Sequence, residues 1–317
     1  MFDVLALGEM LIDFTFVQNN ADGFPIIEAH PGGAVANYLA PISKYGLSTA
    51  LFAKVGNDTF GRLLSKALLS VDINNAFISF TKKAFTTIAF VTLNEYGERE
   101  FSFARKPGAD TLLEIRDIDL SVVKQSKAIH FGSVCMTNEP ARSTHYSVIE
   151  YARKSGLLIS YDPNYRESLW EDCEEARKQI LWGISQADII KISDSELKFV
   201  YGLPPLEGAN RIFSDYSPKL VYVTCGENGC YFKNSSYEGY VPALSGLSVV
   251  DTTGAGDIFD GAAMYALLQT SKQIELLNED DLYSITKFAC TVAGLSTTKH
   301  GGILSVPTME EVQRYMN

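Results

Sequence analysis

Several features that mark specialised classes of protein are missing from this sequence of 317 residues. The longest stretch without Asp, Glu, Lys or Arg runs from Ala29 to Ser43 and contains two prolines. It is too short and too interrupted for a transmembrane helix, which needs about 18 apolar residues or more. The amino terminus has no basic region ahead of its apolar residues, so we expect no signal peptide.

Cysteine and positive charge are also scarce. The five cysteines are scattered and form no CxxC pair, which is typical of reduced thiols in a cytoplasmic protein. Basic residues number 27 against 38 acidic ones, and the net charge is −11. Such a chain repels polyanions, so we expect neither a nucleic-acid partner nor a membrane partner. The four histidines have no metal-ligand spacing, which disfavours a zinc site.

Motifs of three large enzyme classes are absent as well. The sequence has no P-loop motif GxxxxGK(S/T), no HExxH and no GxSxG. The best candidate for a dinucleotide fingerprint begins at Gly254, but Phe259 occupies the position of its third glycine. A dinucleotide-dependent oxidoreductase is therefore disfavoured.

What the sequence does contain is an alternation of two periodicities. Short β-rich runs such as Val4–Gly8 and Ile189–Ile192 alternate with helix-period segments such as Thr59–Leu69 and Arg142–Lys154. Strand, helix and strand at this spacing predict an α/β fold with a mostly parallel sheet flanked by helices. Because no linker composition interrupts the chain, we expect residues 1–317 to form one domain.

Two regions, about 14–30 and 84–106, break this rhythm. Their alternating residues and turn signals predict a small antiparallel sheet at the edge of the larger one, placed to act as a lid. An ordinary surface hairpin explains the pattern equally well. The apolar strand 86–93 is also a candidate for pairing across a homodimer. The four strand-like runs are 14–17, 25–29, 86–93 and 98–104, with a turn expected at 94–97.

The most informative stretch is DTTGAGD, from Asp251 to Asp257, followed by a helix-like run. Small residues let the backbone approach a ligand, and a helix N-terminus presents N–H groups to an anion. Asp257 falls in the first turn, where a carboxylate can accept the proton of an attacking hydroxyl. The alternative is a glycine-rich turn with an aspartate placed favourably against the helix dipole.

Further candidates follow the same logic of polar residues at the starts of helices and the ends of strands. Gly32 and Gly33 precede a helix-like run with Asn37 one turn in, which suits hydroxyl recognition. Asp13, at the expected end of the first strand, would lie at the carboxyl edge of a parallel sheet, where ligands bind. An ordinary helix start and an ordinary turn are the alternatives.

Two later segments have both a structural and a functional interpretation. Ser193 and Glu196 have the spacing of a capping box, and Glu196 is also a candidate for a magnesium–phosphate cluster. The glycine turn after Thr224 suits a hairpin, and a nucleotide could pack on it. Arg105 and Arg166 are candidates for pairing with an anionic group, or else ordinary surface residues.

Taken in order, these stretches resemble the ribokinase-type (PfkB) family of carbohydrate kinases over essentially the whole chain. The GG-x-x-x-N segment is similar to the first family signature, and DTTGAGDIFDGA is similar to the second. DPNYRESLW, EREFSFARKPGAD and KISDSE look most like the fructokinase branch. The resemblance implies a Rossmann-like α/β fold with a β-sheet lid, and transfer of the γ-phosphoryl of ATP, with Mg²⁺, to a sugar hydroxyl.

Carried over by motif, the resemblance also implies roles for individual residues. Asp257 would be the base, and the amides of Gly254, Ala255 and Gly256 would hold the transferring phosphoryl group. Cys290 stands where many members have Asn near the adenosine. The other implied residues are Asp13, Gly32, Gly33 and Asn37 for the sugar; Arg105 and Arg166 near the sugar or phosphoryl; Lys191, Thr224, Gly226 and Gly229 for the nucleotide; Glu196 for Mg²⁺ through water; and Asp251, Thr253, Gly301 and Ser305 for a monovalent cation such as K⁺.

The leading hypothesis is therefore an ATP-dependent fructokinase. The same chemistry with another acceptor, namely 2-keto-3-deoxygluconate, ribose or a nucleoside, stays open, and Arg105 or Arg166 would serve a keto acid. A non-catalytic sugar-sensing protein on the same fold is the alternative from another class. The intact Asp257 and its glycines argue against it, because a binding module does not need the base.

Overall fold

Two sheets organise the chain in the computed structural model, which describes residues 1–93 and 99–316. The large sheet has nine strands in the order β13-β12-β11-β10-β9-β8-β1-β4-β5. Each pair of neighbouring strands from β5 to β11 is parallel, and the pairs β11–β12 and β12–β13 are antiparallel. The predicted mostly parallel α/β fold is confirmed. The strands are β1 (Val4–Leu7), β4 (Thr49–Gly56), β5 (Ile78–Thr81), β8 (Ala128–Gly132), β9 (Leu158–Asp162), β10 (Ile189–Ser193), β11 (Leu220–Thr224), β12 (Cys230–Lys233) and β13 (Glu238–Val241).

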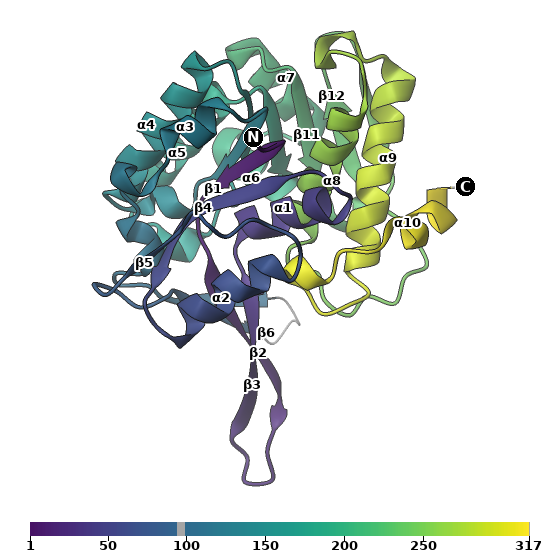
Figure 1. The fold of residues 1–317 in the computed structure, drawn as a ribbon. Coiled ribbons are helices and arrows are strands. Elements are labelled where there is room, and N and C mark those ends of the chain that lie inside the picture. Colours follow the sequence, from purple (N-terminus) through teal and green to yellow (C-terminus); the bar gives the residue numbers. More distant parts are fainter. Residues whose placement is uncertain (94–98, 317) are drawn as a thin grey trace.

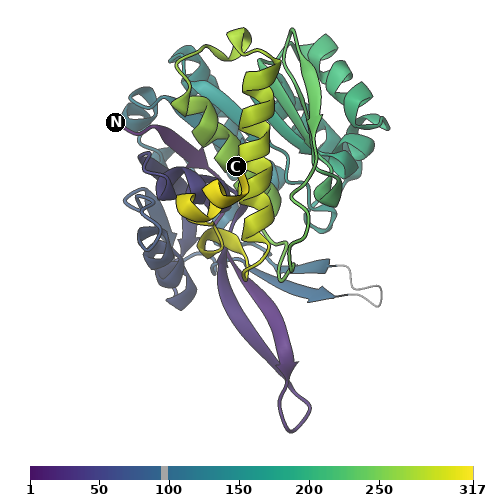
Figure 2. The same cartoon turned by 90° about the vertical axis from the view of Figure 1, so that its right-hand side faces the viewer.

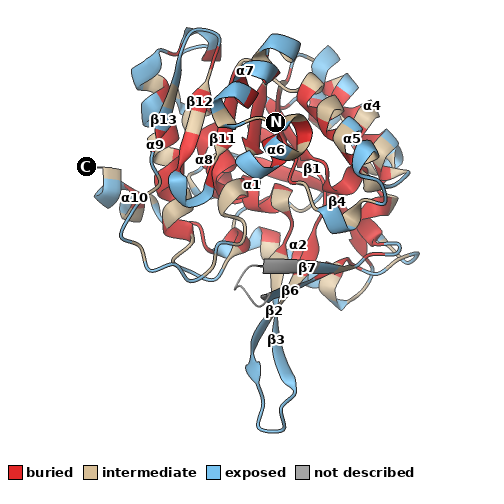
Figure 3. Cartoon of the chain, turned by 180° about the vertical axis from the view of Figure 1, so that it is seen from behind, coloured by how far each residue is buried: buried red, intermediate tan, exposed pale blue. Residues whose placement is uncertain are grey.

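Helices cover both faces of this sheet (Figure 1), as expected when its strands are buried apolar runs. One apolar cluster joins α1, α2, α8, α9 and α10 to one face, and a second cluster joins α3 to α7 to the other. Figure 3 shows the buried residues concentrated along the central strands. The helices are α1 (Ala34–Lys44), α2 (Thr59–Leu69), α3 (Leu120–Lys124), α4 (Ala141–Lys154), α5 (Cys173–Gln186), α6 (Asp194–Tyr201), α7 (Pro205–Tyr216), α8 (Ala255–Gln269), α9 (Glu279–Ser296) and α10 (Met309–Met316).

The small sheet contains two hairpins, β2–β3 and β6–β7, in the order β3-β2-β6-β7. Each hairpin is antiparallel as predicted, but β2 and β6 pair in parallel, so the prediction of a wholly antiparallel sheet was wrong. The chain passes through α1, β4, α2 and β5 between them, and such a crossover returns a strand in the same direction. Its strands are β2 (Leu11–Asn19), β3 (Pro25–Gly32), β6 (Ile88–Leu93) and β7 (Arg99–Ala104); the turn expected at 94–97 lies outside the described residues.

This topology corrects two further expectations. The apolar strand 86–93 corresponds to β6, an interior strand, so it is not the edge that pairs across a dimer; the two edge strands are β3 and β7. Asp13 does not end the first strand of the large sheet. β1 stops at Leu7, and Asp13 lies in β2 of the small sheet, opposite His30 of β3. The apolar run continues through the bend between the sheets, which is why its pattern concealed the change.

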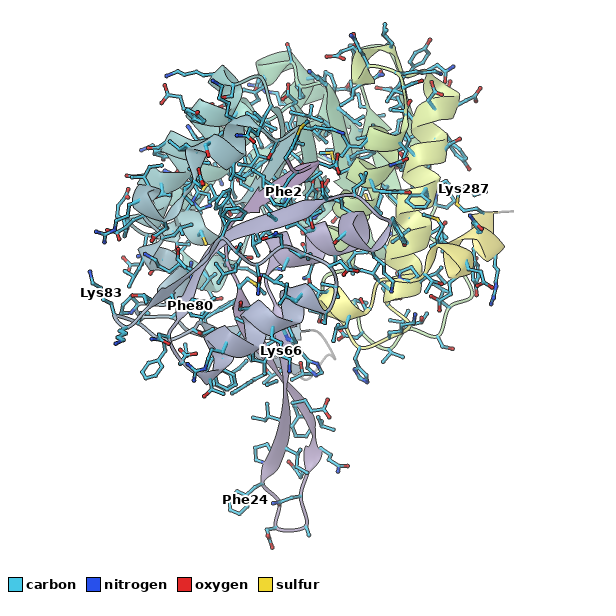
Figure 4. The ribbon with its side chains drawn as sticks, viewed as in Figure 1. Phe2, Phe24, Lys66, Phe80, Lys83 and Lys287 are labelled. Carbon is cyan, nitrogen blue, oxygen red and sulfur yellow. The ribbon has the colours of Figure 1, made fainter. Side chains whose placement is uncertain are left out.

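The β2–β3 hairpin projects away from the rest of the molecule, and the second hairpin leaves the body in a different direction (Figures 1 and 2). The tip is exposed, and Figure 4 shows the Phe24 side chain at its end. The base of the hairpin instead reaches the edge of the large sheet, since Leu11 pairs with the buried Gly32 just before α1.

Helices α1 and α8 approach each other closely because α8 has a glycine where they cross. A Cβ atom on Gly261 would lie 1.9 Å from the carbonyl oxygen of Tyr38 and 2.8 Å from Cγ of Pro41. Pro41 lies inside α1, as the sequence indicated. This close packing of the two helices holds the first turns of α1 and α8 beside each other.

We expect the substitution Gly261→Ala to force these helices apart and to lower the free energy of unfolding by about 2 kcal/mol or more, as overpacking does. Urea unfolding of the purified variant measures this. The comparison change Ala266→Gly, at a partly buried position of the same helix, costs about 1 kcal/mol in helix propensity and loses only the contacts of one methyl group. A wild-type unfolding midpoint for Gly261→Ala would show that the close approach is absent.

Candidate active site

A cavity of about 410 Å³ lies between the small sheet and the carboxyl edge of the large sheet. This is the edge at which ligands bind in open α/β folds. The structure brings most of the residues predicted from sequence to its wall, and these are Asp13, Gly33, Asn37, Arg166, Lys191, Glu196, Thr253, Gly254, Gly256 and Asp257. Residues from the two halves of the chain therefore share one site.

Arg105 lies elsewhere. It lines a neighbouring cavity of about 880 Å³, and among residues 1–93 and 99–316 only Phe103 lines both cavities. Its guanidinium is buried and ion-paired with Asp110, with Nε 2.8 Å from Oδ2, and it also donates to Oγ1 of Thr137 and to the carbonyl oxygen of Val134. This arginine is occupied by partners within the protein.

The predicted nucleotide residues Thr224, Gly226 and Gly229 lie one strand away from the cavity. Thr224 ends β11 and pairs with Ser193 at the end of β10. The segment forms the predicted hairpin, since β11 and β12 are antiparallel and a short turn at Gly226–Asn228 joins them. The glycine turn therefore lies further along the same sheet edge, and none of these three residues lines the cavity.

Asp257 lies in the first turn of α8 and is buried. Its Oδ2 accepts a hydrogen bond from Nδ2 of Asn37 at 2.9 Å, and its Oδ1 accepts one from Nδ2 of Asn164 at 2.6 Å. Burial raises the pKa of Asp257, while Lys191, the Asn37 amide and Arg166 oppose that change. A carboxylate of raised pKa with both oxygens accepting is suited to act as a base.

The ammonium group of Lys191 lies beside the start of α8, since a Cβ on Gly256 would be 3.2 Å from its Nζ. Nζ donates to Oδ2 of Asp162 at 2.8 Å. Burial would lower the pKa of Lys191, but the carboxylates of Asp162, Glu196 and Asp257 outweigh it and raise this pKa, so the side chain stays charged. A cation and a helix N-terminus together favour an anion.

Two glycines allow the backbone to approach closely here. Gly254 caps α8 with φ of 76°, and a Cβ on it would lie 2.8 Å from Nδ2 of Asn37. Gly33 caps α1 with φ of 125°, and its Cβ would lie 2.5 Å from the carbonyl oxygen of Glu9. Both positions combine a left-handed backbone with no room for a side chain.

Glu196 forms the predicted capping box with Ser193 at the start of α6. Its Oε2 accepts from the N–H of Ser193 at 2.8 Å, and its Oε1 accepts from the N–H of Tyr165 at 2.7 Å. In the described part of the chain, no group of three His, Cys, Asp or Glu residues could hold a metal ion by itself. A divalent ion here would depend on ligands brought by a substrate.

The predicted cation loop is brought together from two distant segments. Asp251 accepts hydrogen bonds from the N–H of Thr253 at 2.9 Å and from the N–H of Gly301 at 2.8 Å. The buried Ser305 donates to the carbonyl oxygen of Gly302 at 2.9 Å. The loop before α8 is therefore hydrogen-bonded directly to the segment at 301–305.

Sequence reasoning missed three residues of this site: Glu9, Asp162 and Asn164. Glu9 lines the cavity, and its Oε1 accepts from the N–H of Ala34 at 2.8 Å, so it caps α1 in place of a side chain on Gly33. Asp162 ends β9, and Asn164 follows it. The signal available for Asp162 and Asn164 is their position at and directly after the end of a buried strand, where polar residues face the ligand-binding edge of the sheet.

Comparison with known proteins identifies the family to which this chain belongs. It belongs to the pfkB family of carbohydrate kinases, whose family model matches residues 1–309. The chain is accordingly a kinase that transfers a phosphoryl group to a hydroxyl acceptor, and the resemblance read from its motifs is confirmed. Within residues 1–93 and 99–316, no helix is long and apolar enough to cross a membrane.

Individual relatives are similar over nearly the full length. The chain is 40% identical to probable fructokinase-2 of Arabidopsis thaliana over 310 residues, which cover 96% of this chain and 93% of that protein. Fructokinase of Xylella fastidiosa with bound ATP is 25% identical with a TM-score of 0.89, covering 99% and 98%. A double mutant of the Vibrio cholerae O395 fructokinase, with fructose, ADP and potassium ion bound, is 28% identical with a TM-score of 0.88, covering 100% and 99%.

Glu9 makes a prediction about pH. Burial raises its pKa from 4.5 to about 7, with Asp110 adding to the rise and Arg105 opposing it. The folded state therefore binds this proton more tightly than the unfolded state, and stability is lost as pH rises from about 4.5 through 7. Glu9→Gln keeps an oxygen for the Ala34 amide and removes the titration.

We expect the difference in melting temperature between Glu9→Gln and wild type to move in favour of the variant between pH 5 and pH 8. Thermal denaturation at four pH values across this window measures it. A difference that stays constant with pH would show that Glu9 titrates near its ordinary value in the folded protein.

Proposed function

We propose that this protein is an ATP-dependent fructokinase, which converts fructose and ATP to fructose 6-phosphate and ADP. One observation carries the proposal: the buried carboxylate of Asp257 lies at the N-terminus of α8, between a part of the cavity suited to hydroxyl groups and a part suited to phosphate. Relatives named as fructokinases match nearly the whole chain, which supports fructose as the acceptor.

The sugar is held at the end of the cavity formed by the small sheet and the start of α1. Asp13 of β2 supplies a carboxylate for its hydroxyl groups and Asn37 supplies an amide, while Gly32 and Gly33 let the backbone before α1 pack against Asp13 and Glu9 at this end of the cavity. Asn37 is buried and its Oδ1 makes no hydrogen bond within the protein, so a sugar hydroxyl is a fitting donor to it.

In the reaction, a sugar hydroxyl attacks the γ-phosphorus of ATP, its proton passes to Asp257, and the bond to ADP breaks. The amides of Gly254 and Gly256 face the negative charge of the transferring group, and Lys191 and Arg166 add positive charge at the same wall. The N–H of Ala255 donates to the carbonyl oxygen of Thr252 at 3.2 Å, so it would join them only by giving up that bond. The nucleotide extends along the sheet edge toward Thr224, Gly226 and Gly229, with Cys290 of α9 in the position that many family members give to Asn.

Two cations complete the proposed site. Mg²⁺ would supply charge neutralisation on the phosphates, and Glu196 would hold it through water, in keeping with the lack of a cluster of three protein ligands in the described part of the chain. K⁺ binds at Asp251, Thr253, Gly301 and Ser305, where the loop before α8 is already fixed against the segment at 301–305. Neither cation is required to touch the sugar.

The charge of the cavity bears on the choice of acceptor. Asp13 and Glu9 both line its sugar end; the Asp13 carboxylate disfavours the carboxylate of 2-keto-3-deoxygluconate, and Glu9, whose pKa burial raises to about 7, adds to this only as it ionises. Arg105, one of the two arginines available to such an acid, is ion-paired with Asp110. A neutral ketose has no carboxylate to be repelled and needs no arginine to pair with. A sugar-sensing protein would use the hydroxyl contacts but not Asp257.

The test is ADP release with MgATP and one acceptor at a time: fructose, 2-keto-3-deoxygluconate, ribose, adenosine, fructose 6-phosphate or none, with K⁺ or choline as the counter-ion. We expect the highest kcat/KM on fructose and lower turnover in choline. Higher turnover on another acceptor would overturn the choice of sugar, and no turnover on any would overturn the kinase assignment.

For the role of Asp257, we expect Asp257→Asn to keep the fold and ATP binding but to lose at least about 100-fold in kcat, the scale of a general base. Steady-state kinetics with fructose, together with calorimetric titration of ATP, measure both quantities. Turnover near that of wild type in this variant would remove the base assignment.

We also propose that the small sheet is a lid, that two chains pair through it, and that the protein is cytoplasmic.

The projecting β2–β3 hairpin exposes Phe16, Val17, Phe24, Ile26 and Ile27, a set of apolar side chains larger than a free hairpin is expected to present (Figures 3 and 4). We expect a dimer in sedimentation velocity, and monomers for Ile27→Asp; a monomeric wild type at micromolar concentration would contradict the pairing.

A further inference from the structure

The carboxylate of Asp257 is held by two amides from opposite sides of the site. Asn37 of α1 donates to Oδ2 at 2.9 Å, and Asn164, which follows β9, donates to Oδ1 at 2.6 Å. Because each oxygen accepts one bond, the plane of the carboxylate is fixed and its ionised form is favoured. Each oxygen keeps a further lone pair for the proton of a hydroxyl.

The two amides differ in how they are themselves held. The side-chain oxygen Oδ1 of Asn37 has no hydrogen-bond partner, whereas the backbone is held by a hydrogen bond at each of the three residues 163, 164 and 165. The carbonyl oxygen of Pro163 accepts from the N–H of Ser133 at 3.1 Å, the N–H of Asn164 donates to Oδ1 of Asp162 at 3.1 Å, and the N–H of Tyr165 donates to Glu196.

Asn164 also has an unusual backbone. Its φ is +45°, a left-handed conformation that costs most residues energy but is tolerated by Asn. This turn directs the side-chain amide back toward α8 rather than along β9. Asp162 fixes the turn from the other side, since its second oxygen accepts from Lys191 at 2.8 Å. The left-handed backbone of Asn164 and the buried ion pair between Asp162 and Lys191 thus both help to direct the Asn164 amide toward α8.

We propose that Asn164, which lines the same cavity, is a positioning residue of the phosphoryl transfer: its amide fixes the orientation of the Asp257 carboxylate and keeps it ionised. The inference rests on the proposed function, because it takes Asp257 to be the base. It assigns Asn37 and Asn164 different tasks. Asn37 connects the base to the sugar, and Asn164 connects the base to the protein.

The decisive variant is Asn164→Gly, since glycine keeps the left-handed backbone and removes only the amide. We expect kcat to fall roughly 10- to 100-fold, the scale of one hydrogen bond to a charged group, with the KM values for fructose and ATP unchanged. The acid limb of the kcat–pH profile should move to higher pH, because the ionised carboxylate has lost a donor.

Asn164→Asp is the second variant, and a partly buried asparagine outside the cavity provides the control. Asp tolerates the backbone but places a second carboxylate against Asp257, so the pH shift should exceed that of the glycine variant. The groups facing Asp257 from neighbouring elements, namely Lys191, Glu196, Arg166, Asp162 and Asp260, are unchanged in both. Asn75→Gly removes an amide bonded to Ser65, away from the cavity, and should leave kcat and its pH profile as in wild type.

A titration without turnover separates this inference from the proposed function. In protein with ¹³C-labelled aspartate, the signal lost in Asp257→Asn reports the ionisation of Asp257, and Asn164→Gly should raise its pKa. An unmoved titration, or wild-type kcat in Asn164→Gly, would overturn the positioning role. Inactivity of the wild type on every acceptor would instead overturn the proposed function.

Discussion

The structure depends on burying opposite charges beneath the first turn of α8. Lys191, Asp162 and Asp257 are all removed from solvent, and each is tolerable only because the others are there. Removing one partner from such a group leaves an uncompensated buried charge, which costs far more than the pair gains. The positions of β9, β10 and α8 are therefore fixed relative to one another by electrostatics as much as by apolar packing.

The glycines at the site follow from this constraint. For Asp257 to receive an amide from α1, the two helices must approach more closely than side chains normally allow, and Gly254 and Gly261 make that possible. The same closeness leaves the backbone of the α8 N-terminus as the wall of the cavity. Packing and chemistry are thus satisfied by the same small residues, and DTTGAGD is informative because it encodes both.

Much of the fold could be predicted from the sequence because its signals are local. The helix over Thr59–Leu69 and the capping box at Ser193 have the predicted bounds, since periodicity and capping are set by nearby residues. The parallel pairing of β2 with β6 was missed because register between distant strands is set by the intervening crossover. Asn164 and Glu9 were missed because their importance lies in partners far away along the chain, Asp257 and Ala34.

The β2–β3 hairpin joins two environments on a single pair of strands. Asp13 and its neighbour His30 lie near the base, within reach of the cavity, while Phe24 lies at the exposed tip. A β-bulge between Phe16 and Gln18 lies between the two parts, so β2 bends between the end that lines the cavity and the end that reaches outside the molecule. The same pair of strands thus connects a surface open to a partner with the wall of the cavity through continuous backbone hydrogen bonding.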